Sequence, residues 1–450
     1  MALNPDEMNR RRERREAQRR QQEKERRRLK LTLIAACVVL ALSAFAIVSI
    51  ARGAAQAKQE TLSASVPETE NTTAAPETTA ATESSKRSEP ANTVIHLRAA
   101  GDLNVTNAVI QSGLAVNGYD FTDALLDVAA ELSCGDVTVL NLEGNICGEP
   151  YGTDTTSAPR ELATALKNAG VDLVQMANTY TVKNGIIGLT QTLQQLRSAG
   201  IEPLGAYASN QDFKTTKGYT ICNVGGIKVA FVAFTKGLGG MGLPAGNENC
   251  VNLLYTDYND VYNKVDTKGI TAILDNVAAE KPDVTVAMLH WGSENSENIT
   301  TQQERIITLL QKKGVNVIIG SHPHLLQKIT FNQSAGTLVA YSLGDLIGDA
   351  THAGTNYSII LDVEITKYAD SGTTKVTAFS YVPIYTVKSS ECVAIRQEDA
   401  RRVFRIREAM SAYEGNYVDR VTADAYAGMQ KALTRIEERI QGKSQETKKS

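Results

Sequence analysis

Two histidines stand two residues apart in the segment GSHPH at residues 320–324. They follow an apolar run, residues 315–319, in which β-branched side chains predominate, so that run predicts a buried strand. Pro323 restricts the backbone between the histidines, so the two imidazoles leave the turn in defined directions. Neutral imidazoles held at fixed angles are typical ligands of a divalent metal ion. The alternative is a solvated loop with two histidines of no special role.

Other residues with metal-ligating groups recur where predicted strands end. Because strand ends of one sheet meet at one edge, residues far apart in sequence could share a single site there. Two carboxylates, an amide oxygen and three imidazoles suit Mn, Fe or Zn, and they suit calcium poorly because calcium prefers oxygen ligands throughout. Each residue also has a structural explanation, such as capping a helix or filling a turn. The candidate metal ligands are Asp102, Glu143 (with Asn141 at the same strand end), Asn178, His290, His322 and His324.

The elements that must position these residues alternate between strand and helix. Gly225-Gly226 joins two of the strands as in a β-hairpin, so we expect mixed rather than purely parallel sheets. Strands alternating with helices indicate an α/β fold in which helices cover the sheet. The predicted strands are 94–100, 137–140, 171–176, 219–224, 227–234, 283–290, 315–319, 336–342, 357–366 and 374–385, and the predicted helices are 122–132, 159–169, 185–199, 267–280, 301–313 and two in the last 50 residues.

The N-terminal region has the pattern of a membrane anchor. Residues 1–30 contain 12 Lys/Arg and 6 Asp/Glu, and residues 31–51 form an apolar stretch of 21 positions without a charge. At 1.5 Å per residue, such a helix covers about 31 Å, enough to cross the apolar core of a bilayer. The positive-inside rule then predicts a cytoplasmic tail, a single transmembrane helix, and a main domain outside the cytoplasm. A cleaved signal peptide is the alternative, because Ala51, Ala54 and Ala55 could form a cleavage site.

Residues 52–93 predict a disordered stalk. They are mostly Ala, Thr, Ser, Glu and Pro, and such a segment cannot bury enough apolar surface to offset the entropy lost on ordering. The stalk would separate the membrane from a main domain at 94–390, which a helical extension at 391–450 follows.

The charge distribution argues against a nucleic-acid-binding protein, and the cysteine spacing argues against a structural zinc site. The residues after position 30 carry a net charge of −9, so the positive charge is not on the folded part and we expect no nucleic-acid partner. The six cysteines contain no CxxC pair, which argues against a structural zinc site. Spacing leaves open whether Cys134–Cys147 or Cys222–Cys250 form disulfides.

Five motifs, in order along the chain, resemble those of the CapA family of poly-γ-glutamate capsule biosynthesis proteins, which are related to calcineurin-like metallophosphatases. The resemblance extends from about residue 94 to about residue 385. It implies a layered α/β/β/α metallophosphatase-like sandwich, and it implies that the six candidate ligands above are the metal-site positions. The motifs are AGD at 100–102, NLE at 141–143, HWGSE at 290–294, GSHPH at 320–324 and YSLG at 341–344.

One loop departs from the family pattern. The family usually has Ala-Asn-Asn-His followed by x-x-Asp-x-Gly, whereas residues 177–185 read ANTYTVKNG, with Tyr180 and Lys183 at the two altered positions. In the related phosphatases, the histidine of this loop stabilises negative charge on the substrate. A phenol can donate a hydrogen bond but supplies no cation at neutral pH. The catalytic candidates are Tyr180, Lys183 and His290. A second departure follows the YSLG motif, where the family has Asn-Phe and this chain has Asp345-Leu346.

Three functions remain open. The first is a membrane-anchored CapA-like protein that acts in synthesis, attachment or export of an anionic polymer such as poly-γ-glutamate, with other capsule or envelope polymer synthesis proteins as partners. The second is an extracytoplasmic metal-dependent phosphoesterase. The third is a non-catalytic envelope scaffold with a degenerate site. Loss of one charge-stabilising donor typically lowers a rate about 100- to 1000-fold, so the altered loop leaves both hydrolysis and its absence open.

Overall fold

The computed structural model describes residues 91–415, 417 and 421–440 of the 450-residue chain. The predicted basic tail, the predicted transmembrane helix at 31–51 and most of the predicted stalk lie outside these residues. Within the described part, no helix combines the length and the apolar character that a membrane crossing requires. The five cysteines in that part are all free thiols, so neither Cys134–Cys147 nor Cys222–Cys250 forms a disulfide.

The larger sheet has eight strands and mixes parallel with antiparallel pairing. One half is parallel, from β1 through β4 and β5 to β6, and the other half is antiparallel, from β14 to β16. The halves join where β1 pairs antiparallel with β14. In sheet order, the strands are β16 (Arg401–Arg405), β15 (Thr374–Lys388), β14 (Tyr357–Lys367), β1 (Thr93–Asn104), β4 (Val137–Glu143), β5 (Leu173–Gln175) and β6 (Glu202–Leu204), and β13 (Asp345–Ile347) pairs with β1 beside this path.

The smaller sheet has six strands, with a parallel centre and antiparallel edges. The pairing of β7 with β8 is the hairpin that Gly225-Gly226 predicts. The two sheets together confirm the expectation of mixed sheets. In sheet order, the strands are β11 (Ile329–Asn332), β12 (Thr337–Ala340), β10 (Val317–Ser321), β9 (Val284–His290), β8 (Ile227–Thr235) and β7 (Thr220–Val224), and β2 (Leu114–Ala115) and β3 (Gly118–Tyr119) form a separate small ribbon.

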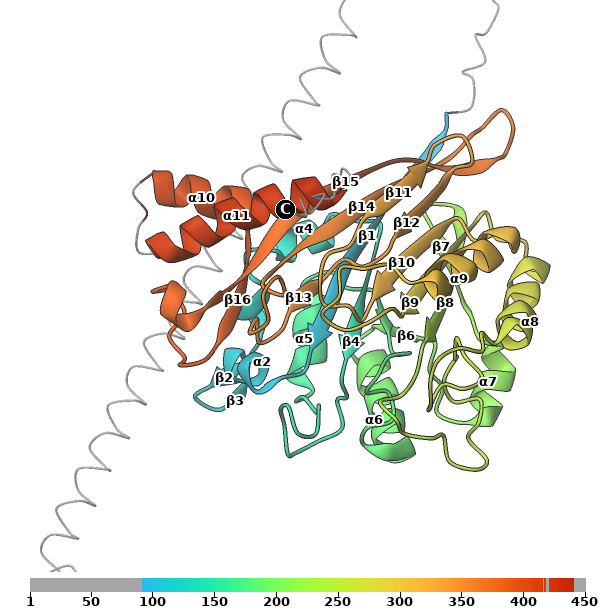
Figure 1. Ribbon diagram of the computed structural model, residues 1–450, viewed down its shortest axis with the longest axis horizontal. Coiled ribbons are helices and arrows are strands. Elements are labelled where there is room, and N and C mark those ends of the chain that lie inside the picture. Colours follow the sequence, from blue (N-terminus) through green and yellow to red (C-terminus); the bar gives the residue numbers. More distant parts are fainter. Residues whose placement is uncertain (1–90, 416, 418–420, 441–450) are drawn as a thin grey trace, which may run out of the picture. The chain divides into compact units, whose positions relative to one another are not determined.

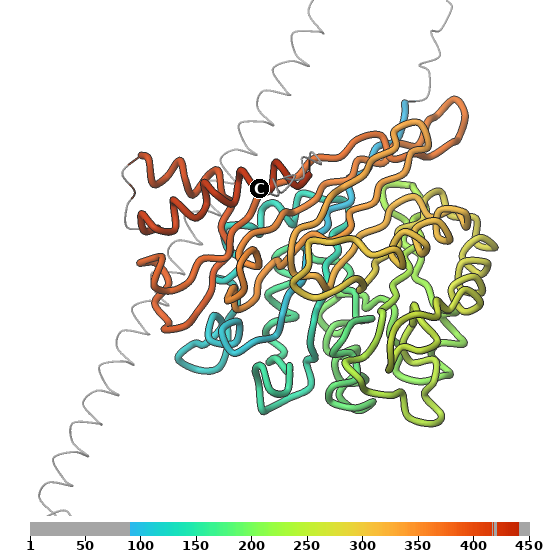
Figure 2. Tube along the Cα trace, viewed as in Figure 1, coloured from blue at the N-terminus to red at the C-terminus, as the bar shows by residue number. Residues whose placement is uncertain are grey.

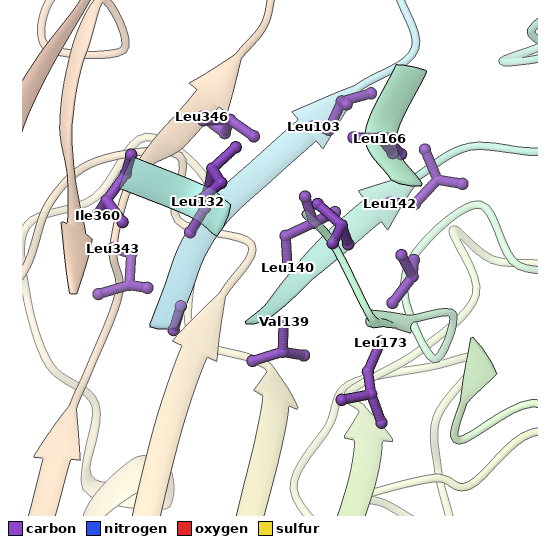
Figure 3. Close-up of a cluster of buried hydrophobic side chains, with 14 of the residues drawn as sticks. Leu103, Leu132, Val139, Leu140, Leu142, Leu166, Leu173, Leu343, Leu346 and Ile360 are labelled. Carbon is purple, nitrogen blue, oxygen red and sulfur yellow. The ribbon is translucent and has the colours of Figure 1, made fainter. Parts of the chain in front are cut away.

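The two sheets share a hydrophobic core. Because successive side chains of a strand point to opposite faces, β8 contributes to two clusters of buried residues. Val229 and Phe231 join the cluster that contains the larger sheet, whereas Ala230 and Val232 pack with α8 and α9. Figure 3 shows the shared cluster around β1 and β4, where helices supply Leu132 and Leu166. The smaller sheet is therefore covered by the larger sheet on one face and by helices on the other.

Helices flank the sheets, and several begin with side-chain caps. At α9, Thr300 accepts a hydrogen bond from the Gln303 N–H while the Gln303 side chain accepts one from the Thr300 N–H, which is a capping box. Figures 1 and 2 show α10 and α11 beside β15 and β16. The helices are α2 (Asn107–Ser112), α3 (Thr122–Leu125), α4 (Ala129–Ser133), α5 (Glu161–Asn168), α6 (Gly185–Ser198), α7 (Asn210–Thr216), α8 (Thr267–Ala279), α9 (Thr301–Lys312), α10 (Ile406–Glu414) and α11 (Ala423–Ile440), with a 3₁₀ turn at Ser389–Glu391.

Most predicted elements are present, and the structure adds elements that the sequence did not predict, namely α2, β2, β3, β6, α7 and β11. Three further segments need correction. The expected helix at 122–132 is two short helices, α3 and α4. The C-terminal region 391–450 is not helical throughout, because β16 lies within it and pairs with β15. The short strand β13 follows the YSLG motif in a segment for which the sequence predicted no strand. β13 and β16 are only three and five residues long, too short for the alternation of apolar and polar residues to identify them as strands.

Two glycines allow the segment 341–345 to cross close to the strands that carry the candidate site. A Cβ at Gly101 would lie 1.8 Å from the carbonyl oxygen of Gly344, and one at Gly320 would lie 1.9 Å from that of Tyr341. Since no side chain can be accommodated at such distances, only glycine permits these close approaches. The crossing brings Asp345 into register beside Asp102.

Candidate metal centre

Four strand ends supply the candidate site. In the larger sheet, β1 carries Asp102 and its parallel neighbour β4 ends at Glu143, and both side chains are buried. In the smaller sheet, β9 ends at His290, and His322 directly follows β10. His290 Nε2 is 3.4 Å from Glu143 Oε1, and the main-chain N–H of His322 donates to Asp102 Oδ2 at 3.0 Å. The ends of the two sheets therefore meet at this edge and bring the candidate ligands together, as the sequence predicted.

Two groups of three side chains have the spacing of a metal site, and Glu143 belongs to both. The inner set comprises Glu143, His290 and His322, and the outer set comprises Asp102, Glu143 and His324. In each set, one ligand atom per residue lies within 4.8 Å of the others. In the outer set, His324 Nε2 is 3.8 Å from Glu143 Oε2, and Nδ1 is 3.6 Å from Asp102 Oδ2. A carboxylate common to both sets would allow two ions to lie close together, as in two-metal hydrolases.

Buried polar atoms without hydrogen-bond partners show that the residues fit a cation. Both carboxylate oxygens of Glu143 and the Nδ1 atom of His322 are buried and accept or donate no hydrogen bond. Leaving such groups unpaired in a protein interior is costly, most of all for a carboxylate. A divalent ion bound to Glu143 and the imidazoles would remove this cost. The chemistry of the donor set, with His, Asp and Glu together, is that of a Mn, Fe or Zn site.

The turn that carries the two histidines has an uncommon backbone conformation. His322 has φ 91° and His324 has φ 57°. Both values are positive, and residues other than glycine rarely adopt a positive φ. Asp102 holds this turn, because its Oδ2 accepts the main-chain N–H of His322, and its Oδ1 accepts from Asn141 Nδ2 at 2.7 Å. Strain of this kind persists where the surrounding structure enforces it, and it is frequent at functional sites.

Burial and charge shift the pKa values of the inner residues of the site. Burial, together with the negative charge of Glu143, raises the pKa of Asp102 to about 8. Burial also lowers the pKa of His322 well below its ordinary value, and the positive charges of His290 and Lys236 add to this effect. A neutral His322 has the protonation state that metal ligation requires.

The pKa values of Glu143 and His324 depend on opposite charges. Burial favours the neutral form of Glu143, but the charges of His290 and His324 outweigh burial and lower its pKa. Burial likewise favours neutral His324, yet Asp345, Glu143 and Asp102 raise its pKa well above the ordinary value. The site thus has an excess of acidic groups around one imidazole, and binding a divalent cation would balance that excess.

His290 is held by two hydroxyl groups. Its Nδ1 lies 3.2 Å from Ser321 Oγ, and its Nε2 lies 2.9 Å from Thr179 Oγ1. With the ring proton on Nδ1 donated to Ser321, Nε2 would be the nitrogen available to a metal beside Glu143. Lys236, which directly follows β8, donates its main-chain N–H to the His290 carbonyl at 2.8 Å. The sequence pattern gave no sign of Lys236, because nothing in it distinguishes this lysine from a surface lysine.

Asn178 lies next to the two ligand sets and forms hydrogen bonds within the protein. Its Nδ2 donates to the Leu142 carbonyl at 2.6 Å and to Asn141 Oδ1 at 3.2 Å, and its Oδ1 accepts from the Tyr180 N–H at 3.0 Å. An amide oxygen has a second lone pair, so this contact leaves ligation by Asn178 a prediction. In the present geometry, Asn178 connects the end of β4 to the altered loop.

The two altered loop residues point in different directions. Tyr180 lines a cavity of about 260 Å³ at the site, together with Glu143 and His324. Burial, with the charges of Glu143 and Glu294, raises the pKa of the Tyr180 phenol, so it stays protonated at neutral pH. The Lys183 side chain is exposed, and it is not among the residues that line this cavity. Tyr180 is thus placed to donate into the cavity, whereas Lys183 is not.

The cavity also contains residues that the sequence did not identify as site residues. Asp345 is buried and lies 2.8 Å from His324 (Oδ1 to Nδ1), and Glu294, Asp349 and His352 line the same cavity. The departure from the family pattern at Asp345-Leu346 was the one available signal for Asp345. His352 lies in the loop after β13, and neither its neighbours in sequence nor the strand pattern indicated a role.

Solved structures with some similarity include a calcineurin-like phosphoesterase, YfkN, from Bacillus subtilis. It is 17% identical, with a TM-score of 0.39, and the match covers 65% of this chain and 91% of that one. A phosphatase from Mycoplasma pneumoniae is 11% identical, with a TM-score of 0.39, and the match covers 65% of this chain and 95% of that one. Similarities at this level carry no functional argument.

Curated relatives and a family model give a firmer assignment. The capsule biosynthesis protein CapA of Bacillus anthracis is 27% identical over 249 residues, which is 55% of this chain and 56% of that protein. The PGA biosynthesis protein CapA of Bacillus subtilis is 26% identical over 208 residues, 46% of this chain and 50% of that protein. The chain thus spans about half the length of these relatives. The model of the bacterial capsule synthesis protein PGA_cap matches residues 96–350, more than half of the chain, so the chain belongs to the PGA_cap family.

Proposed function

We propose that this chain is a membrane-anchored, extracytoplasmic CapA-like protein that acts in synthesis, attachment or export of an anionic surface polymer such as poly-γ-glutamate. Family membership supports a part in capsule synthesis, and the two curated relatives are named for it. The anchor rests on the sequence, where the apolar stretch 31–51 follows a basic segment. The partners would be the cell membrane and other capsule or envelope polymer synthesis proteins.

The observation that carries a chemical role is the state of Glu143. Glu143 is a fully buried carboxylate with no hydrogen-bond partner, and it lies among three imidazoles. Burying such a group is costly unless positive charge balances it, and a divalent cation bound to Glu143 and the imidazoles would supply that charge. The proposed metal positions are Asp102, Glu143, Asn178, His290, His322 and His324. The packed sheets with flanking helices are compatible with the metallophosphatase-like sandwich that the motifs imply, and we propose that architecture for residues 94–390.

The residues of the chain have separable tasks in such a site. A divalent ion would act as a Lewis acid toward a phosphoryl or carbonyl oxygen of the substrate. Tyr180 would donate a hydrogen bond to a substrate from the cavity wall, and its raised pKa keeps the phenol proton in place. Ser321 and Thr179 fix the ring of His290. The exposed Lys183 would act only if the loop moved, so Tyr180 is the stronger candidate for stabilising negative charge.

A genetic experiment tests the polymer role. The gene is deleted in a host that forms an anionic surface polymer, and the polymer is measured on the cells and in the medium. We expect less polymer on the surface, with recovery by the full-length wild-type gene but not by a Glu143→Gln variant. Unchanged polymer after deletion would contradict the proposal. Recovery by Glu143→Gln would keep the polymer role and remove the metal centre from it.

A second candidate, a metal-dependent phosphoesterase with an unrelated substrate, is favoured by the two ligand sets that share Glu143. It predicts Mn²⁺-dependent hydrolysis of simple phosphodiesters by the purified full-length protein. Absence of both bound metal and turnover would eliminate it.

The third candidate, a scaffold without turnover, is favoured by the altered loop at 178–185. Here a Tyr180→His, Lys183→Asp double variant would restore the family residues. A gain of metal binding or hydrolysis by this variant, from an inactive wild type, would support the scaffold. Hydrolysis by the wild-type protein would exclude it.

A further inference from the structure

Asp345 is a buried carboxylate of the site that belongs to neither ligand set. Its Oδ1 atom lies 2.8 Å from His324 Nδ1, and its side chain is 5% exposed. The next carboxylate oxygen from this nitrogen, Asp102 Oδ2, is farther away at 3.6 Å. Asn104 Nδ2 lies 3.5 Å from the same nitrogen, so the contact with Asp345 is the shortest and strongest of the three.

The backbone fixes the position of this carboxylate. Asp345 begins β13 and is in register with Asp102 of β1. Its main-chain carbonyl accepts a hydrogen bond from Ser358 Oγ at 2.6 Å, and the residue before it, Gly344, accepts the main-chain N–H of Asp102 at 2.9 Å. Hydrogen bonds to β1 and β14 thus fix the backbone at Asp345, and the fold itself determines its contact with His324.

This contact determines which nitrogen of His324 faces the metal site. A carboxylate accepts a hydrogen bond, so Nδ1 carries a ring proton, and Nε2 is the nitrogen that would exchange its proton for a metal ion. Nε2 is the atom that lies 3.8 Å from Glu143 Oε2. The other two imidazoles have weaker support, because His290 Nδ1 meets the hydroxyl of Ser321 and His322 Nδ1 has no partner.

We propose that Asp345 is a positioning residue that holds His324 with Nε2 directed to a divalent cation shared with Asp102 and Glu143. The inference rests on the metal centre of the proposed function. Metal-ligating histidines commonly donate the other ring N–H to a carboxylate, which fixes the ring and raises its basicity. Removing such a partner typically weakens metal binding about 10- to 100-fold.

The test is Mn²⁺ binding by calorimetry to the purified full-length protein. Asp345→Asn keeps the size of the side chain and removes its charge, and Asp345→Ser is a second variant should the first fail to fold. We expect the Kd of the weakened site to rise about 10- to 100-fold. The matched control is Asp260→Asn, which makes the same change at an exposed acid that does not line the cavity. The control should bind Mn²⁺ as the wild type does.

A double-mutant cycle separates positioning from direct ligation. If Asp345 acts through His324, then Asp345→Asn has no further effect in a His324→Gln background. A direct ligand would weaken binding equally in both backgrounds, and that result would overturn the proposal. The Co²⁺ absorption spectrum gives a second readout, since a reoriented His324 changes the ligand field of bound Co²⁺ whereas a change in stability alone does not.

The two proposals can fail separately. If the wild-type protein binds no divalent metal, then the metal centre itself is wrong, and the role of Asp345 with it. If the wild type binds Mn²⁺ and Asp345→Asn binds it equally well with an unchanged Co²⁺ spectrum, then only the positioning role is wrong.

Discussion

The inner and outer ligand sets share Glu143 but differ in what surrounds them. The inner set has two imidazoles and is fully buried, and the ring of His290 forms hydrogen bonds with two hydroxyl groups. The outer set has two carboxylates and one imidazole, and His324 and Glu143 line the cavity. The inner set is thus rich in nitrogen, and its two imidazoles do not line the cavity, whereas the outer set is rich in oxygen and its imidazole does.

The difference indicates a division of tasks within one site. Imidazole suits Zn and Fe, whereas carboxylate suits Mn and Mg, so the two sets should differ in metal preference. The open set is the one that a substrate in the cavity can approach. Asp345 reinforces this set, because it supports the one imidazole that the set contains.

The largest expected effect comes from removing the residue that both sets share. Glu143→Gln should abolish binding at both sets, a greater loss than the roughly 10- to 100-fold cost of an outer-shell partner. Metal content after equilibrium dialysis, measured by mass spectrometry on the full-length protein, is the readout. Glu304→Gln, on the exposed surface of α9, is the matched control and should retain all metal. Full metal content in Glu143→Gln would show that the two sets are not coupled through this carboxylate.

The next effect separates the two sets. His322→Gln should remove one equivalent of metal and mainly reduce Zn²⁺ binding, and His324→Gln should remove one equivalent and mainly reduce Mn²⁺ binding. Competition titrations with both ions check this. The comparison fails if both variants lose the same ion to the same extent.

A smaller effect concerns Asp102 in the metal-free protein. Its pKa is about 8 in the folded state against an ordinary value of 3.8, so the folded protein binds this proton more tightly than the unfolded chain. The group therefore contributes stability below pH 4, and that contribution is lost as pH rises toward 8. Each pKa unit of difference corresponds to about 1.4 kcal/mol.

Asp102→Asn removes this pH dependence. We expect its free energy of unfolding, relative to that of the metal-free wild type, to increase steadily between about pH 4 and pH 8. Urea unfolding at several pH values with a chelator present measures it. The lost hydrogen bonds of Asp102 give an offset that does not change with pH. A difference that is flat across this range would show that Asp102 is ionised in the folded protein.

The smallest effect is expected at Lys183. Because its side chain is exposed and does not line the cavity, Lys183→Ala should change the free energy of unfolding by no more than about 0.5 kcal/mol. Metal affinity and any phosphodiester hydrolysis should also stay at the wild-type level. A clear loss of hydrolysis would show that the loop rearranges to bring Lys183 into the cavity.

Much of the framework was predictable from local pattern. Alternating strands and helices gave the α/β class, Gly225-Gly226 gave the hairpin, and the ends of β4, β9 and β10 were identified within a few residues. These features depend on periodicity and turn residues, which short segments of sequence contain. The missed strands, among them β6, β11, β13 and β16, are three to five residues long and are stabilised by pairing with neighbouring strands. Segments this short show no clear periodicity of their own.

By itself, the sequence determined which residue types stand at strand ends and therefore which could bind a metal. Tertiary structure alone decided how they divide into two sets through Glu143, because that depends on how two sheets pack against each other. It also decided that Tyr180 lines the cavity while Lys183 does not. An irregular loop has no repeating pattern, so its sequence does not show which of its side chains face the cavity. The contact of Asp345 with His324 has the same origin. It exists because Gly101 and Gly320 have no Cβ, which allows the segment 341–345 to pass in close contact with the strands that carry the site. No local sequence pattern predicts such a contact.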